Sequence, residues 1–164
     1  MTPQLQYEIE QFLYRKSALC DAQQWDEYLD LFTEDSEFHL PQWDSEHVYT
    51  TDPKKGMSLI YYANRGGLED RVFRIRTGKA ASTVPMPRTL HLISNVRVSE
   101  SPQQGELIVD ANWHTLFHRL GCAEQFFGRA TYTLVGEGES RKIRRKHVVL
   151  LNDTINSVLD FYHL

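Results

Sequence analysis

The chain has 164 residues and a formal net charge of −4 at pH 7, with 41% hydrophobic, 24% charged and 12% aromatic residues. This composition predicts a single globular domain over residues 1–164, and the acidic balance argues against nucleic-acid binding. No apolar run is long enough to span a bilayer and no secretory leader is visible, so we expect a cytoplasmic protein. Cys20 and Cys122 lack a C-x-x-C spacing and are expected to be reduced, although a bridge between them stays open.

The first helix is predicted from residue 3 to residue 20. Thr2 can cap it, and Pro3 takes its first position, where the missing N–H costs nothing. Its apolar stripe has helical spacing and consists of Leu5, Ile9, Phe12, Leu13, Leu19 and Cys20.

A second helix is predicted directly after the first. Asp21 and Gln24 have the spacing of a capping box, with Asp21 as the capping residue. The apolar face of this helix is expected to hold Trp25, Tyr28, Leu29 and Phe32. Residues 33–35 are expected to end the helix, and residues 36–40 to form a short strand.

The middle of the chain mixes loop, strand and helix. Residues 44–56 are polar and contain Pro53 and Gly56, so a loop is expected there. Residues 57–63 are expected to form a strand. A short helix follows, with Leu68, Val72 and Ile75 on one face and Gly78 at its C-terminal end.

The second half of the chain alternates, which predicts long strands near residues 90–98, 107–117, 126–134 and 142–151. In the first of them, Leu90, Leu92, Val96 and Val98 are expected on one face, opposite His91, Asn95 and Arg97. Helices that precede such strands predict an α+β, cone-shaped fold. In it, the N-terminal helices pack in a curved antiparallel sheet and leave an open mouth.

Three residues in the second of these strands have the chemistry of an iron site. Asp110, His114 and His118 supply two histidines and one carboxylate. Because apolar residues alternate with them, the segment is predicted as a strand, and four residues of strand span roughly 13 Å. The three side chains therefore cannot meet one ion. The two separate cysteines also fail to provide a Rieske cluster, so no metal or cofactor is expected on this chain.

Acid–base chemistry in the cone mouth remains an alternative. His91, Asp110, His114 and Tyr132 could line a pocket there, with His39 and Tyr62 nearby. The alternative hypothesis is therefore a stand-alone small-molecule isomerase or dehydratase. There is no nucleophile elbow or phosphate-binding loop, and no catalytic residue is assigned.

Two further segments stand out. Arg141–His147 contains five cations in six residues, which predicts an exposed strand end at a sheet edge, solvated or paired with a partner; nucleic-acid binding is the other hypothesis. The C-terminal segment Val158–Leu164 is rich in large apolar groups. Since chain ends fray unless they dock, it must pack on its own domain or on a neighbour.

Several segments carry a family resemblance. Leu31–Asp35 with Phe38 resembles the helix-to-strand passage of the cone-shaped nuclear-transport-factor-2-like (NTF2-like) superfamily. Arg71–Gly78 and Pro87–Val96 resemble the small (β) subunit of aromatic-ring-hydroxylating dioxygenases, of the benzoate and anthranilate branch. The strand around Arg144 and the apolar C-terminus are also similar, so the resemblance covers essentially the whole chain.

This resemblance implies a structural, non-catalytic subunit of an α3β3 oxygenase, with β–β contacts and no membrane or nucleic-acid partner. The α subunit would carry a Rieske [2Fe–2S] cluster and mononuclear Fe(II), and would perform the O2- and NADH-dependent cis-dihydroxylation of an aromatic acid. Candidate residues for contact with partner subunits are Arg74, Arg76, Arg144, Arg145, Phe161 and Tyr162.

Overall fold

The computed structural model describes residues 1–164, in which three α-helices accompany one six-stranded sheet. The helices are α1 (Pro3–Asp21), α2 (Trp25–Asp30) and α3 (Gly66–Thr77). The strands are β1 (Phe32–Pro41), β2 (Ser58–Tyr62), β3 (Arg88–Glu100), β4 (Glu106–Arg119), β5 (Cys122–Val135) and β6 (Lys142–Leu150). Short 3-10 turns lie at Ala81–Thr83, Gly138–Ser140 and Phe161–His163. No helix is both long and apolar enough to cross a membrane.

The helix ends follow the local signals in two of three cases. The Thr2 hydroxyl accepts a hydrogen bond from the Leu5 N–H at 3.1 Å, with Pro3 in the first helical turn, as predicted. Gly78 ends α3 in the left-handed conformation at φ 64°, also as predicted. The predicted capping box is wrong, because Asp21 belongs to the last turn of α1. The residue before α2 is Gln24, whose side chain caps nothing.

Strand β1 begins earlier than its sequence indicates. Phe32 was expected on the second helix, but it is the first residue of β1 and pairs with Ile143 of β6. Helix α2 therefore ends at Asp30. The expected helix is wrong here because pairing with a strand more than a hundred residues away overrides a short local pattern.

The sheet has the strand order β2-β1-β6-β5-β4-β3. Its strand pairs are antiparallel except β1 and β6, which run parallel, so the expected antiparallel sheet contains one parallel pair. Strand β6 lies in the middle of the sheet, and Lys146 within it is fully buried. The prediction that Arg141–His147 forms a sheet edge is therefore wrong, because β1 pairs with β6 on one side and β5 pairs with it on the other.

A β-bulge in β3 reverses which of its residues face the core. Asn95 has φ 55°, and the β3–β4 register shifts between Ser94 and Arg97. His91 therefore lies on the same face as Val98, while Leu90 and Leu92 lie on the opposite, exposed face. The predicted division of this strand is wrong because a bulge breaks the two-residue period.

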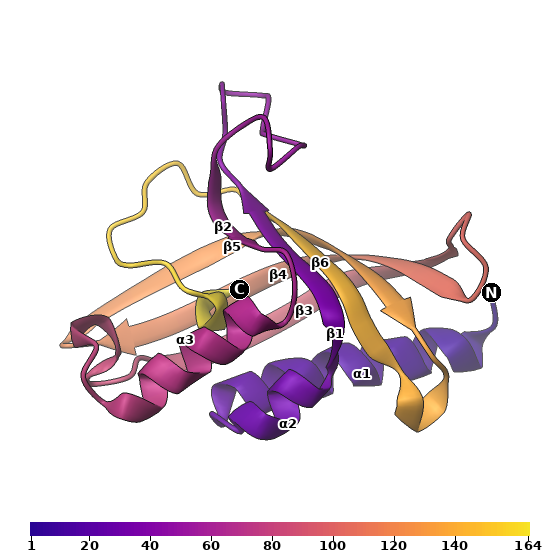
Figure 1. The fold of residues 1–164 in the computed structure, drawn as a ribbon, viewed down its shortest axis with the longest axis horizontal. Coiled ribbons are helices and arrows are strands. Elements are labelled where there is room, and N and C mark those ends of the chain that lie inside the picture. Colours follow the sequence, from indigo (N-terminus) through magenta and orange to yellow (C-terminus); the bar gives the residue numbers. More distant parts are fainter.

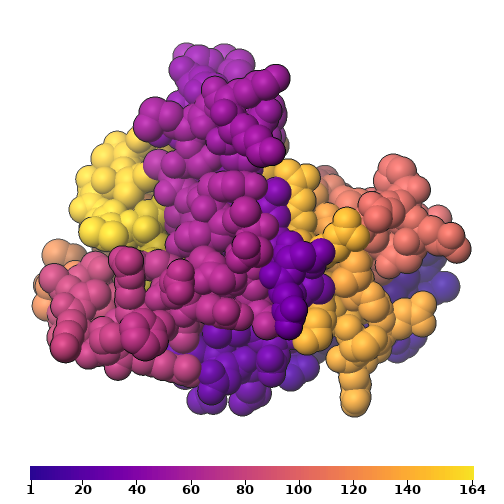
Figure 2. Space-filling model, viewed as in Figure 1, coloured from indigo at the N-terminus to yellow at the C-terminus, as the bar shows by residue number.

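The sheet has an inner face, which packs against the helices, and an outer face. Neighbouring residues across the inner face are Val98, Val109, Tyr132, Lys146 and Phe38. Figure 1 shows the helices gathered along one side of the sheet, while the loop 42–57 between β1 and β2 projects from the body. The same projection stands out in the space-filling view (Figure 2). The predicted α+β fold, with N-terminal helices packed against a curved sheet, is confirmed.

Candidate functional site

The interior between α1 and the sheet contains an acid–base pair, formed by the half-buried Asp21 and the buried ring of His91. The Asp21 carboxylate accepts hydrogen bonds from the Thr89 hydroxyl at 2.8 Å, the His91 N–H at 3.0 Å and His91 Nδ1 at 2.5 Å. Burial opposes the charge on Asp21, but its bonds to His91 outweigh burial and lower its pKa. Burial lowers the pKa of His91, so the ring is neutral at pH 7 and donates through Nδ1. Its Nε2 atom is then buried without a partner.

Two lysines lie in the same interior. Lys16 on α1 and Lys146 on β6 are 1% and 0% exposed, and both amines lie over the Tyr132 ring, 5.4 and 5.9 Å from its centre. Burial and the nearby charge of Lys16 hold the pKa of Lys146 well below its usual range. Its Nζ donates to the main-chain oxygen of Leu164 at 3.0 Å. Amines and imidazoles whose pKa is lowered can act as bases or nucleophiles where a substrate reaches them.

The C-terminal tail, residues 160–164, occupies this interior. All five residues are at most 3% exposed. The Phe161 ring lies 5.5 Å from Trp25 and 5.8 Å from Tyr28, measured between ring centres. Asp160 forms an ion pair with Arg71 of α3. The tail therefore docks on its own chain, which decides between the two options that the sequence left open. Phe161 and Tyr162 do not contribute to an exposed surface.

The tail leaves no room for a substrate at the acid–base cluster. None of the five main cavities is lined by His91, Lys146 or Tyr132. The cavity beside the tail, next to Tyr162 and His163, has a volume of about 90 Å³, which is below the usual size of a ligand pocket. The cluster is therefore suited to holding α1, β3 and the tail together rather than to converting a ligand.

We expect Asp21→Asn to lower the free energy of unfolding by about 2–3 kcal/mol, because a carboxylate that accepts three hydrogen bonds at a part-buried site becomes an amide. Urea denaturation at pH 7 measures this change. Asp153→Asn, at an exposed site, is the matched control and should have little effect. Equal stabilities of the two variants would show that the pair does not join α1 to β3.

The predicted pocket residues are not brought together by the fold. His91 and Tyr132 lie on the inner face, whereas Asp110 and His114 lie on the outer face. Asp110 accepts a hydrogen bond from Thr131 at 2.6 Å, and His114 bonds to Gln125 at 2.7 Å. The four residues therefore cannot act on one ligand.

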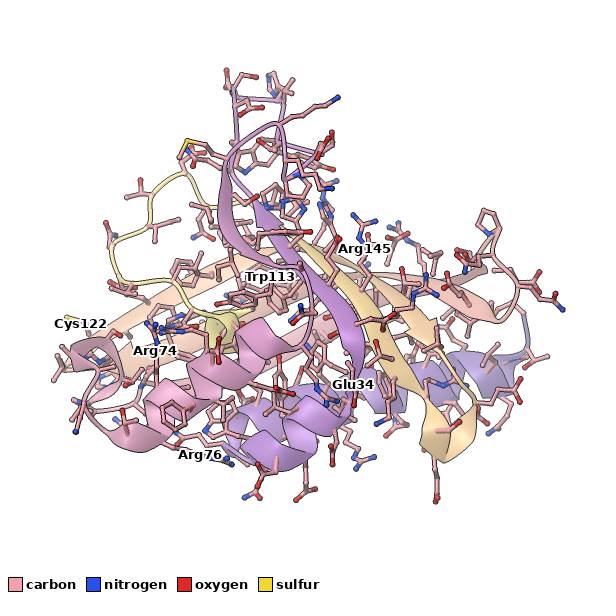
Figure 3. The ribbon with its side chains drawn as sticks, in the orientation of Figure 1. Glu34, Arg74, Arg76, Trp113, Cys122 and Arg145 are labelled. Carbon is pink, nitrogen blue, oxygen red and sulfur yellow. The ribbon has the colours of Figure 1, made fainter.

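The iron-type donors are also dispersed. Asp110, His114 and His118 lie at four-residue intervals along β4, whose predicted extended conformation is confirmed. Cys20 is buried, with its sulfur 3.9 Å from the Tyr162 oxygen, while Cys122 is exposed at the β4–β5 turn, at the far end of the sheet (Figure 3). No three His, Cys, Asp or Glu side chains are grouped to hold a metal ion. The donor set of this chain thus does not fit either a Rieske cluster or a mononuclear iron.

The exposed arginines proposed for partner contacts lie in two regions (Figure 3). Arg74 and Arg76 are on α3, and Arg76 pairs with Asp26 at 2.9 Å. On β6, Arg144 pairs with Glu106, and Arg145 pairs with Glu37 at 3.0 Å. Arg74 forms no ion pair within the chain.

The outer face carries a row of polar side chains that sequence analysis did not connect. The cross-strand neighbours in this row, from β3 to β2, are Arg97, Asp110, Thr131, His147, His39 and Tyr61. Inside the fold, Lys16 was also missed. Its spacing with Ile9, Leu13 and Cys20 places it on the buried stripe of α1, so helical periodicity could have identified it.

The chain is similar to known proteins over its whole length. Residues 15–157 match the family model for the ring hydroxylating beta subunit. The chain is 54% identical over 164 residues to the anthranilate 1,2-dioxygenase small subunit of Acinetobacter baylyi, covering 100% of both chains. It superposes on the crystal structure of the benzoate 1,2-dioxygenase beta subunit from Burkholderia mallei with a TM-score of 0.78, 43% identity and 95% coverage of both chains. A naphthalene 1,2-dioxygenase chain shares the fold at a TM-score of 0.81 and 20% identity, covering 96% of this chain and 84% of that one.

Proposed function

The chain belongs to the ring hydroxylating beta subunit family, and we propose that it is the structural β subunit of an aromatic-ring-hydroxylating dioxygenase of the anthranilate and benzoate type. The observation that carries this proposal is the full-length 54% identity to a protein named as an anthranilate 1,2-dioxygenase small subunit. A small subunit implies a larger one, so the partner of this chain is the oxygenase α subunit.

The role of the chain in that complex is support rather than catalysis. Its interior acid–base cluster is closed by residues 160–164, and its possible iron donors lie far apart along one strand. We assign the Rieske [2Fe–2S] cluster and the mononuclear Fe(II) to the α subunit. The oxidation of the aromatic acid, with electrons from NADH, then takes place in α, and the use of NADH suits a cytoplasmic complex.

We further propose an α3β3 stoichiometry with contacts between β subunits. Free surface for such contacts exists on the helix α3 of this chain, where Arg74 is unpaired and Phe73 is 69% exposed. It also exists on the outer face of the sheet, where Leu90 and Leu92 of β3 are 57% and 46% exposed. Exposed apolar side chains next to cations are typical of the surfaces on which subunits meet.

The test is co-expression with a large oxygenase subunit of the anthranilate and benzoate type, followed by size-exclusion chromatography with light scattering, iron analysis and turnover of benzoate and anthranilate. We expect a stable complex in which iron and activity require the large chain. We also expect the isolated chain to contain no stoichiometric iron and to convert neither acid. Turnover of either compound by the isolated chain, or failure of the two chains to associate, would overturn the proposal.

A further inference from the structure

The tail, residues 160–164, is joined to the sheet by a segment without regular structure, residues 151–159, here called the strap. No residue of the strap is buried, and Figure 1 shows the strap leaving β6 as an open loop that returns to the body beside α3. The two main-chain hydrogen bonds that the tail forms, of 3.0 and 3.1 Å, both stay within the tail. The tail is therefore a small unit of its own, which pairs with no strand of the sheet.

One ion pair, here called the latch, ties the tail to helix α3. The Arg71 guanidinium approaches both oxygens of the Asp160 carboxylate, and its Nε donates to Oδ2 at 3.1 Å. The Asp160 side chain is 3% exposed and the Arg71 side chain 21% exposed. Loss of one member of such a buried pair is strongly destabilising, because the other member keeps no partner. The latch thus holds the tail at the residue where the strap ends.

Polar atoms without a partner in the chain lie beside the tail. They are His91 Nε2, Thr115 Oγ1 and the Tyr28 hydroxyl. His91 and Thr115 are cross-strand neighbours, and the Tyr28 ring lies against that of Phe161. A buried polar atom without a partner is costly, and contact with water removes the cost. Docking of the tail therefore gains apolar contacts but leaves these atoms unpaired, which lowers the free energy needed to open it.

A cavity of about 90 Å³ lies where the strap passes the tail. Its lining includes Ser157 and Val158 of the strap, Tyr162 and His163 of the tail, and Phe117 of β4. The tail is therefore not close-packed on every side, in contrast to the usual density of a protein interior. Its side chains have space to move into without first displacing a strand.

We propose that the tail is a lid that opens as one unit, hinged on the strap and held shut by the latch, while α1 and the sheet stay folded. Opening presents the acid–base cluster of the interior to solvent. It also frees the Lys146 amine, which donates to the Leu164 oxygen in the closed form. The inference goes beyond the proposed function and does not depend on it, because it makes the sealed interior a state that the chain can leave.

Cys20 reports on the position of the tail, because its sulfur lies 3.9 Å from the Tyr162 oxygen and the residue is 3% exposed. Burial raises the pKa of the Cys20 thiol to about 12, so the thiol is inert to alkylation while the tail is closed. Cys122→Ser, at an exposed site, leaves Cys20 as the one thiol of the chain. The rate at which iodoacetamide alkylates Cys20, followed by mass spectrometry of the intact chain, then measures the open fraction.

The experiment measures this rate in the full Cys122→Ser chain at a series of low urea concentrations, beside global unfolding followed by tryptophan fluorescence. We expect alkylation to be at least about a hundredfold faster than global unfolding permits and to change little with urea, because opening of the lid exposes little surface. Asp160→Asn and Arg71→Gln should each raise the rate about tenfold or more by removing the latch. Asp70→Asn is the matched control, since it makes the same change at an exposed carboxylate of α3 that forms no ion pair.

Two results would overturn the inference. Alkylation that follows global unfolding, with the full urea dependence of that transition, would show that the tail opens only with the whole fold. A local opening whose rate is the same with and without the latch would assign the exposure of Cys20 to fraying at the end of α1. If a latch variant does not fold, the urea dependence of the chain with an intact latch and the rate in the other latch variant still decide. Failure to bind a large oxygenase subunit would overturn the proposed function and leave this inference standing, because the measurement needs this chain alone.

Discussion

Replacing Phe161 with alanine is expected to lower the free energy of unfolding by about 3–5 kcal/mol, the usual cost of emptying a fully buried phenylalanine site. The side chain is 0% exposed and lies between Trp25 and Tyr28 of α2. Loss of the Phe161 ring is also expected to loosen the rest of the tail. There, the Leu164 oxygen accepts the hydrogen bond of the buried Lys146 amine. Urea denaturation followed by tryptophan fluorescence measures the change.

The control for this prediction is Val158→Ala, three residues earlier on the same segment. Val158 is 63% exposed, so the substitution should change stability by less than about 0.5 kcal/mol. Similar effects of the two substitutions, or a stable Phe161→Ala variant, would contradict the docked position of the tail. Assembly with the large subunit should decline in the Phe161 variant only as far as its folded fraction declines.

Acid is expected to release the tail through His163. Burial, followed by the charge of His91, lowers the pKa of His163 from 6.5 to about 3. The Asp160 N–H donates to His163 Nδ1 at 2.9 Å, so this atom must be unprotonated in the fold. Between pH 6.5 and about 3 the unfolded chain therefore binds a proton that the folded chain does not. Stability is full above pH 6.5 and falls as the pH is lowered through this range, by as much as about 4–5 kcal/mol.

The slope of stability against pH isolates this contribution from that of the carboxylates. His163→Gln should be less stable than the wild type at pH 7 but should lose less stability between pH 7 and pH 4. His47→Gln, in the exposed loop 42–57, should keep the wild-type slope. His147→Gln should also flatten the curve, because the pKa of His147 is lowered to about 4. Urea denaturation at a series of pH values provides the curves, and identical slopes for all four proteins would exclude the histidines as the cause.

An interior closed to substrate, with unpaired cations and leucines exposed on the outer face, is consistent with a supporting subunit. The interior holds a neutral histidine, an ionised aspartate and a lysine of lowered pKa, but the tail occupies the space a substrate would need. The unpaired cations and exposed leucines lie on the opposite side of the sheet. The titratable groups of the interior thus contribute to stability rather than to chemistry on a ligand.

The local sequence was sufficient to predict the parts of the fold that depend on neighbouring residues. Thr2 and Pro3 correctly predicted the start of α1, and Gly78 predicted the end of α3. Alternating apolar residues predicted the positions of β4 and β5. The motifs around Arg71–Gly78 and Pro87–Val96 also identified the family, because a family pattern samples the whole chain. For the helix ends and the strands, the deciding interactions lie within a few residues, so the local sequence contains them.

The positions of the charged and polar groups, by contrast, follow from long-range packing. Asp21 has the spacing of a helix cap, yet it serves His91, 70 residues away. Lys146 belongs to a cationic run, yet it is buried between the sheet, Lys16 of α1 and the tail, and one bulge at Asn95 exchanges the faces of β3. The physical reason is that burial depends on which distant strand or tail covers a residue. Which segment covers a given residue depends on the packing of the whole chain, and a local hydrophobic period does not reveal it.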